Sequence, residues 1–163
     1  MAGEPVNVLF ICPNNACRSI MAETLLNKLG QGRFVAFSAG PKPKGQISPY
    51  VAETLQQVGY DTTDLRSKHW DMFVTPSSPR LDVVVTLCDS LKDIRMPIWY
   101  SNPVRVHWGF SNPEEVEGED QERVAAFRRC YGDLEQLALK MAALASDGIR
   151  GRALAQLLEA IKP

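Results

Sequence analysis

The sequence predicts an α/β fold in which helices cover both faces of a parallel sheet. Two apolar runs, at 8–12 and 83–88, are of the kind that buried parallel strands need, and segments of helical periodicity alternate with the predicted strands. With 163 residues, the chain has the length of one domain and can bury a substantial core without disulfides. We therefore expect a single domain over residues 1–163.

The first half of the chain predicts two pairs of a strand and a helix. In order, they are a strand at 6–11, a helix from 19 to 30, a strand at 34–38 and a helix from 48 to 59. Turn formers at 13–15 separate the first strand from its helix. Ser19 is the expected N-cap of that helix and Gly30 its end, while Pro49 suits the first turn of the next one.

The second half predicts two further strands and two helices. In order, they are a strand at 81–87, a weaker strand between 97 and 107, a helix at 121–144 and an amphipathic helix at about 149–161. Apolar residues recur in the long helix at alternating steps of three and four, which is the period of one buried helix face. Residues 145–163 are expected to form a helical extension of the domain.

Composition excludes several classes of partner. A net charge of -1 and a pI near 6.1 give no global attraction to nucleic acid or to an anionic membrane. The apolar runs are far shorter than the roughly 20 residues of a membrane span.

The N-terminal residues lack the pattern of a secretory signal, so we expect a cytoplasmic protein whose four cysteines are thiols. The spacings of Cys12 and Cys17, and of His69 and His107, predict no metal site.

The loop CPNNACRS at 12–19 favours an oxyanion cradle. It joins a strand to a helix at the edge where parallel sheets bind ligands, and the next apolar strand also ends in a cysteine, Cys88. Five residues between Cys12 and Arg18 can wrap backbone N–H groups around a tetrahedral anion, and the same positive field favours a Cys12 thiolate. Ser19 can donate a hydrogen bond to that sulfur. The expected anion-binding residues are Asn14, Asn15, Ala16, Cys17, Arg18 and Ser19.

These residues also have plainer interpretations. Cys12 could be a buried thiol at a strand end with Arg18 on the surface, but the context of strand, loop and helix favours the cradle. Cys17 and Cys130 are better interpreted as packing thiols. Cys88, taken alone, fits a structural role as well as a functional one.

Five segments in order, VLFICPNNACRSIMAE, FSAG, GQISPYVAETLQQVGYDTTDLRSKHWDMF, LDVVVTLCD and HWGFSNP, resemble the low-molecular-weight tyrosine phosphatases and, within them, the thiol-dependent arsenate reductases. The resemblance covers most of the chain. It implies a flavodoxin-like three-layer sandwich with a four-stranded parallel sheet and helices on both faces. The cradle motif is shared by both activities, whereas TLCD with Cys88 favours the reductases, which have their second redox cysteine there.

The resemblance implies a mechanism built on two thiols. Cys12 would attack arsenate held by Arg18, with Asn15 bracing the loop and Ser19 beside the thiolate. Cys88 would then attack Cys12, which expels arsenite and leaves a Cys12–Cys88 disulfide. No cofactor is expected to stay bound, and turnover requires an external thiol reductant: thioredoxin, glutaredoxin or glutathione.

Two positions depart from the family pattern. Many relatives have a third redox cysteine where Met96 stands here, and a thioether cannot relay a disulfide, so the external reductant must attack directly unless Cys130 folds nearby. The general acid of the family is an aspartate where Asn112 precedes Pro113. An asparagine cannot protonate a leaving oxygen, a loss that should harm phosphate ester hydrolysis more than arsenate chemistry.

Other residues near these motifs have less certain roles. Glu114 or Glu115 could replace the acid, although solvated loop charges fit them better. Lys68 stands where some relatives place an acid that helps to bind a monovalent cation, which predicts activity independent of potassium. Packing roles are expected for a further three residues, His107, Trp108 and Phe110.

The sequence thus predicts an arsenate reductase. Two alternatives remain open. One is a phosphatase that uses Cys12 and Arg18 but not Cys88, and the other is an oxyanion-binding or redox-sensing protein that has lost turnover.

Overall fold

The computed structural model describes residues 4–144 and 149–163 and contains one four-stranded parallel sheet. Its strands are β1 (Val6–Ile11), β2 (Phe34–Ala39), β3 (Val83–Thr86) and β4 (Val104–His107), in the spatial order β2-β1-β3-β4. Ile11 pairs with both Ala39 and Thr86, and Thr86 pairs with His107, so the carboxyl ends of all four strands are in register. The loops that follow the strands therefore emerge at one edge of the sheet.

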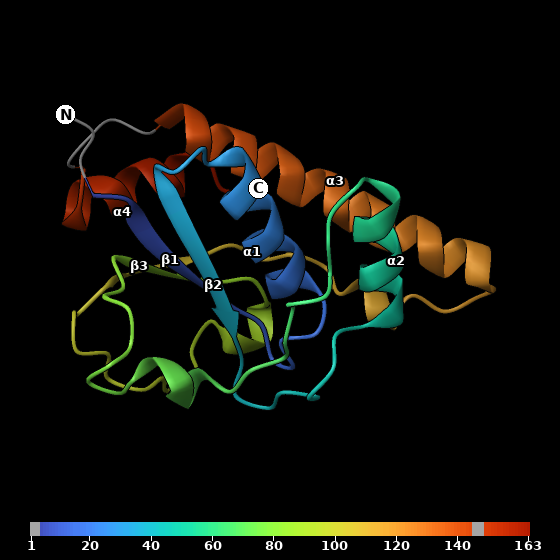
Figure 1. Cartoon of the computed structure of the whole chain (residues 1–163), viewed down its shortest axis with the longest axis horizontal. Coiled ribbons are helices and arrows are strands. Elements are labelled where there is room, and N and C mark those ends of the chain that lie inside the picture. Colours follow the sequence, from blue (N-terminus) through green and yellow to red (C-terminus); the bar gives the residue numbers. More distant parts are fainter. Residues whose placement is uncertain (1–3, 145–148) are drawn as a thin grey trace.

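The two faces of the sheet are covered differently (Figure 1). Four α-helices share one core with alternate residues of the strands: α1 (Arg18–Leu29), α2 (Pro49–Gln57), α3 (Asp120–Leu144) and α4 (Gly151–Ala160). On the other face, Leu9, Ile11 and Val84 pack against loops and two short 3-10 helices, η1 (Trp70–Phe73) and η2 (Asp89–Leu91). The predicted sandwich is confirmed, with its second helical layer reduced to single turns.

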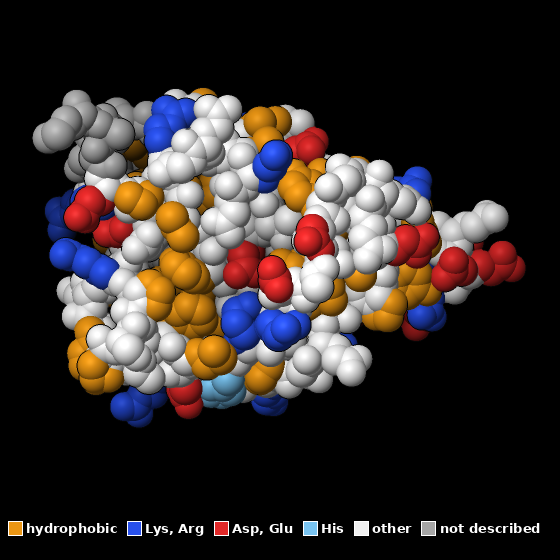
Figure 2. Space-filling model, in the orientation of Figure 1, with side chains coloured by type: hydrophobic (Ala, Val, Ile, Leu, Met, Phe, Trp, Pro, Cys, Tyr) orange, Lys and Arg blue, Asp and Glu red, His pale blue; other side chains and the backbone are white. Residues whose placement is uncertain are grey.

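The surface seen in Figure 2 reflects the position of β2 at an edge of the sheet. Apolar side chains gather there over the region of β2, and charged side chains spread around them. Val35 and Phe37 of this strand are half-buried, whereas β3, in the interior of the sheet, is buried throughout.

The start of α1 differs from the sequence prediction. Ser19 was expected to cap this helix, but the helix begins at Arg18, and the residue at the cap position, Cys17, makes no side-chain capping bond. The Ser19 hydroxyl is instead engaged by Cys12 and Asn15. At the other end, Gly30 closes the helix as predicted, and its backbone N–H donates to the carbonyl oxygen of Leu26 at 2.8 Å.

The C-terminal helix is anchored to the sheet layer. Leu154 and Leu158 of α4 are buried in the α-helical core, and the indole Nε1 of Trp108 donates a hydrogen bond to the Leu158 carbonyl at 3.2 Å. The predicted extension begins with 145–148, which lie outside the described residues. Within the described ranges, no helix is long and apolar enough to cross a membrane.

Candidate active site

The loop between β1 and α1 turns its carbonyls outward and leaves its amides free. The carbonyl oxygens of Pro13, Asn14 and Ala16 accept hydrogen bonds from the backbone N–H groups of residues 42, 44 and 48. In contrast, no acceptor within the described residues receives a hydrogen bond from the backbone N–H groups of 14–19. Since an unpaired buried N–H is costly, these amides are available to donate hydrogen bonds to an anion.

The segment after β2 fits closely against this loop. A Cβ at Gly40 would lie 2.2 Å from the carbonyl oxygen of Cys12 and 2.8 Å from that of Pro13, so only glycine is accommodated there. The Ser67 hydroxyl also donates to the Asn14 carbonyl at 3.0 Å. Chain segments distant in sequence thus fix the shape of the cradle.

Asn15 and Ser19 form a chain of hydrogen bonds that ends at Cys12. The Asn15 side-chain amide donates to the Ser19 hydroxyl oxygen at 2.7 Å, and that oxygen lies 2.9 Å from the Cys12 sulfur. Because the hydroxyl already accepts from Asn15, its own proton can point to the sulfur, where it stabilises a thiolate. Asn15 holds a left-handed backbone with φ of 45°, and its Oδ1 accepts from the backbone N–H of Lys68 at 2.7 Å.

Arg18 lies at the base of the cradle and is only 4% exposed. One terminal nitrogen donates to the Phe110 carbonyl at 2.9 Å, while its buried Nε has no partner among the described residues. Burial alone would lower the pKa of Arg18, but the negative charge of the Cys12 and Cys88 thiolates raises it above the usual value. The guanidinium is therefore a fixed cation with an unused donor next to two thiols.

Cys88 follows β3 and is half-buried. Burial alone would raise the pKa of Cys88, yet this pKa lies below its usual value because Ser90 donates hydrogen bonds to the thiolate and the positive charge of Arg18 attracts it. The Ser90 hydroxyl lies 3.0 Å from the Cys88 sulfur. Sequence reasoning singled out Cys88 but missed Ser90, for which the only signal was its place two residues later.

A second network joins the ends of β3 and β4 below Cys88. The His107 ring nitrogens lie 2.6 Å from the Thr86 hydroxyl and 2.8 Å from a carboxylate oxygen of Asp89. A Cβ at Gly109 would lie 2.5 Å from that carboxylate, so a larger residue there would displace the Asp89 side chain from His107. The sequence predicts only a packing role for His107, but its ring nitrogens also contact Thr86 and Asp89. Trp108 is fully buried, as expected for a packing residue.

Lys68 places a cation behind the cradle. Its ammonium donates to the Arg66 carbonyl at 2.7 Å and to the Ser38 hydroxyl at 3.3 Å, and it lies 3.8 Å from the Glu23 carboxylate. Ser38 in turn donates to Glu23 at 2.9 Å. Burial raises the pKa of Glu23 and lowers that of Lys68. A lysine ammonium thus occupies the region in which the sequence suggested a monovalent cation site had been lost.

Asn112 is used as a local cap. Its side-chain oxygen accepts from the backbone N–H of Glu114 at 3.0 Å and begins the short 3-10 helix η3 (Pro113–Glu115). Glu114 pairs with Lys44 at 3.0 Å. Neither of these two side chains is hydrogen-bonded to the residues of the cradle.

The other two cysteines, Cys17 and Cys130, are shielded. Cys17 and Cys130 are buried, and burial raises the pKa of both thiols, that of Cys130 to about 12. Such thiols are poor nucleophiles. Met96 packs against the core of the loop-covered face.

Within the described part of the chain, no group of three His, Cys, Asp or Glu side chains could hold a metal.

Comparisons with known proteins agree with this geometry. A model of the family described as low molecular weight phosphotyrosine protein phosphatase matches residues 7–148. An arsenate reductase of Halalkalibacterium halodurans is 36% identical over 127 residues, which are 78% of this chain and 88% of the relative. An arsenate reductase in the phosphate-binding state superimposes with a TM-score of 0.65 and 25% identity, over 86% of this chain and 99% of the other. A thioredoxin-dependent arsenate reductase of Corynebacterium glutamicum gives a TM-score of 0.60 and 27% identity, over 90% of this chain and 66% of the other.

Proposed function

This chain belongs to the low molecular weight phosphotyrosine protein phosphatase family, and we propose that it is an arsenate reductase that works through a Cys12 adduct and a Cys12–Cys88 disulfide. One observation carries the proposal: Ile11 pairs with Thr86, so Cys12 and Cys88 follow the carboxyl ends of two adjacent strands, at the edge of the sheet where the buried Arg18 also lies. A phosphatase has no need of a second activated thiol beside its anion site. Support also comes from the arsenate reductases among the relatives.

The first step joins arsenic to sulfur. The free amides of 14–19 and the unpaired Nε of Arg18 bind the arsenate oxygens, and the Cys12 thiolate attacks the arsenic. A sulfur–arsenic bond forms while an arsenic–oxygen bond breaks, and the oxygen leaves as hydroxide or water. Because Asn112 supplies no proton, that proton comes from the arsenate itself or from solvent.

The second step is the reduction. The Cys88 thiolate attacks the Cys12 sulfur, a disulfide forms, and the electron pair of the sulfur–arsenic bond stays on arsenic. Arsenic gains two electrons and leaves as arsenite, and the two thiols lose two electrons. An external thiol reductant, thioredoxin, glutaredoxin or glutathione, then restores both thiols. The thioredoxin-dependent relative favours the first of these three.

Steady-state turnover tests the proposal. With arsenate and a thioredoxin system, Cys88→Ser should abolish arsenite production, while Cys130→Ser, which removes a shielded thiol, should leave it unchanged. The same two variants should be assayed with an aryl phosphate and no reductant. Undiminished arsenite production by Cys88→Ser would refute the disulfide route. Rapid ester hydrolysis that survives Cys88→Ser would favour a phosphatase, and tight anion binding without any product would favour a protein that has lost turnover.

A further inference from the structure

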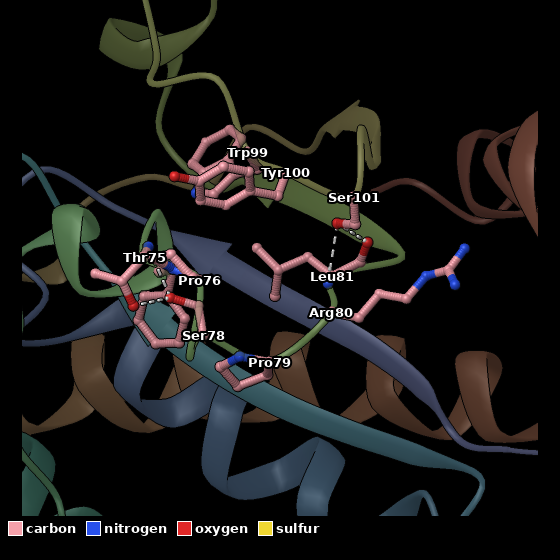
Figure 3. A pocket seen from close by; sticks show the side chains of 10 residues that line it. Thr75, Pro76, Ser78, Pro79, Arg80, Leu81, Trp99, Tyr100 and Ser101 are labelled. Carbon is pink, nitrogen blue, oxygen red and sulfur yellow. Dashed lines mark hydrogen bonds between the residues drawn. The ribbon is translucent and has the colours of Figure 1, made fainter.

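A cavity of about 550 Å³ opens at the end of the sheet opposite to the cradle (Figure 3). It lies between segment 73–81, which leads into β3, and segment 99–101, which leads into β4. The cradle follows the carboxyl end of β1, whereas this cavity is built at the amino ends of β3 and β4. The two sites are thus separated by the length of the strands.

The walls of the cavity are about half apolar and half polar, and the apolar part includes three aromatic side chains. Phe73, Leu81 and Trp99 are buried side chains of the loop-covered core that also line the cavity. Tyr100 adjoins Trp99 and is 74% exposed, and Pro79 lies at the opposite end in Figure 3. Rings and prolines of this kind provide flat surfaces against which a planar ligand can pack.

The serine hydroxyl groups of the cavity are already engaged. The Ser101 hydroxyl accepts from the Leu81 backbone N–H at 3.1 Å and donates to the Leu81 carbonyl at 2.6 Å. The Ser78 hydroxyl donates to the Met72 carbonyl and accepts from the Thr75 backbone N–H, both at 3.0 Å. These bonds hold the two segments in place and leave the hydroxyls little capacity for a ligand.

One donor in the cavity wall has no partner. Trp99 is only 4% exposed, and its indole Nε1 makes no hydrogen bond within the described residues. In Figure 3 this nitrogen lies on the side of the ring that faces Thr75 and Pro76. The Trp108 indole shows the usual arrangement, because its Nε1 donates to the Leu158 carbonyl. A buried donor left unpaired is costly and calls for a ligand or a water.

The other buried side-chain atom without a partner in the described ranges is Arg18 Nε, which lies in the oxyanion cradle. There the missing partner is the substrate that the cradle is built to bind. By the same logic, Trp99 Nε1 indicates an acceptor that is supplied from outside the chain. An indole N–H only donates, so the ligand must carry an acceptor.

The ligand is not selected by charge. Arg80 is the one charged residue among the lining residues, and in Figure 3 its guanidinium points away from Trp99.

We propose that this cavity binds a neutral aromatic molecule that carries a carbonyl oxygen. The ring packs between Phe73, Leu81 and Tyr100, and the oxygen accepts from Trp99 Nε1.

A matched pair of small probes tests this proposal, acetophenone and ethylbenzene, which differ in the carbonyl group. The full chain is labelled with 15N, and its three tryptophans give separate indole N–H signals. Acetophenone should shift the Trp99 indole signal and leave that of Trp108 in place. It should also bind about tenfold more tightly than ethylbenzene, which corresponds to about 1.4 kcal/mol.

Two variants locate the hydrogen bond. Trp99→Phe keeps an aromatic ring but removes the donor, so the preference for acetophenone should fall to about unity. Arg80→Met should retain the full preference. An unshifted Trp99 signal at saturating acetophenone would overturn the proposal, as would equal binding of the two probes to the unmodified protein. Arsenate turnover plays no part in these measurements, so their outcome is independent of the proposed function.

Discussion

The segments that carry the two proposed reactive thiols are held in very different ways. The loop after Cys12 is buried, and hydrogen bonds from 42, 44, 48 and the Ser67 side chain fix its carbonyls. The segment after Cys88 exposes large apolar side chains, with Ile98 92% exposed, and has only single turns of helix. This difference suits the proposed mechanism: a rigid cradle would bind and orient the anion, while a lightly held segment would let the Cys88 thiol approach Cys12 to form the proposed disulfide.

Replacing the Arg18 guanidinium should cause the largest loss of activity. In Arg18→Lys, one ammonium replaces the planar set of donors that reaches the Phe110 carbonyl and that we propose to bind the anion. We expect kcat/KM for arsenate to fall about 100- to 1,000-fold, the range for loss of an oxyanion donor. Calorimetric titration with phosphate should show the loss in binding directly. Full anion affinity in Arg18→Lys would contradict the assignment of the cradle.

A smaller loss is expected when the hydroxyl beside Cys12 is removed. Ser19→Ala deletes the donor that lies 2.9 Å from the sulfur, and the thiolate loses a hydrogen bond to a charged group. Alkylation of Cys12 by iodoacetamide at neutral pH should slow about 10- to 100-fold. Alkylation of Cys88 provides the internal control and should keep its rate. Equal slowing of both cysteines would mean that the whole edge of the sheet, and not Cys12 alone, had been disturbed.

The variant Ser90→Ala should change the pH dependence of Cys88 reactivity. The pKa of Cys88 lies below its usual value, so the thiolate persists to lower pH than in a free cysteine, and loss of the Ser90 hydroxyl should raise that pKa. The midpoint of Cys88 alkylation should move to higher pH by less than about one unit. The fall in reactivity is then confined to the low-pH side of the profile. A midpoint that stays fixed would show that the Ser90 backbone N–H and Arg18 stabilise this thiolate without help from the hydroxyl.

The smallest effect on activity is predicted for a change of salt. Because the Lys68 ammonium lies between Ser38 and Glu23, replacing sodium by potassium should leave turnover unchanged. In Lys68→Gln the Glu23 carboxylate loses its cation, and we expect the free energy of unfolding to fall by about 2 kcal/mol. Urea titrations of Lys68→Gln and of the surface variant Lys42→Gln measure this loss. Potassium activation of the unmodified protein would contradict this role of Lys68.

The fold could be predicted because its signals are local. The apolar runs of β1 and β3, the helical period of α3 and the stop at Gly30 each lie within a few residues of one another. The loop of Cys12 was recognisable for the same reason. The cap assigned to Ser19 was wrong because the nearby sulfur and Asn15 engage its hydroxyl.

Much of the candidate site depends on contacts between distant residues. Arg18 donates to the carbonyl of Phe110, 92 positions away, and Asn15 accepts from Lys68, 53 positions away. Backbone carbonyls and amides have no sequence signature, so such partners become visible only once the chain is folded. The link between His107 and Asp89 is of the same kind, since it depends on the pairing of β3 with β4.

We propose that Cys12 and Cys88 together give two electrons to one arsenic atom. Reduced protein, freed of external thiol, should be mixed with arsenate and analysed by peptide mass mapping together with a count of arsenite. We predict one arsenite per chain, a disulfide that joins Cys12 to Cys88, and Cys17 and Cys130 still reduced. Arsenite formed while Cys88 remains a free thiol, or a disulfide that joins Cys12 to another cysteine, would contradict the account.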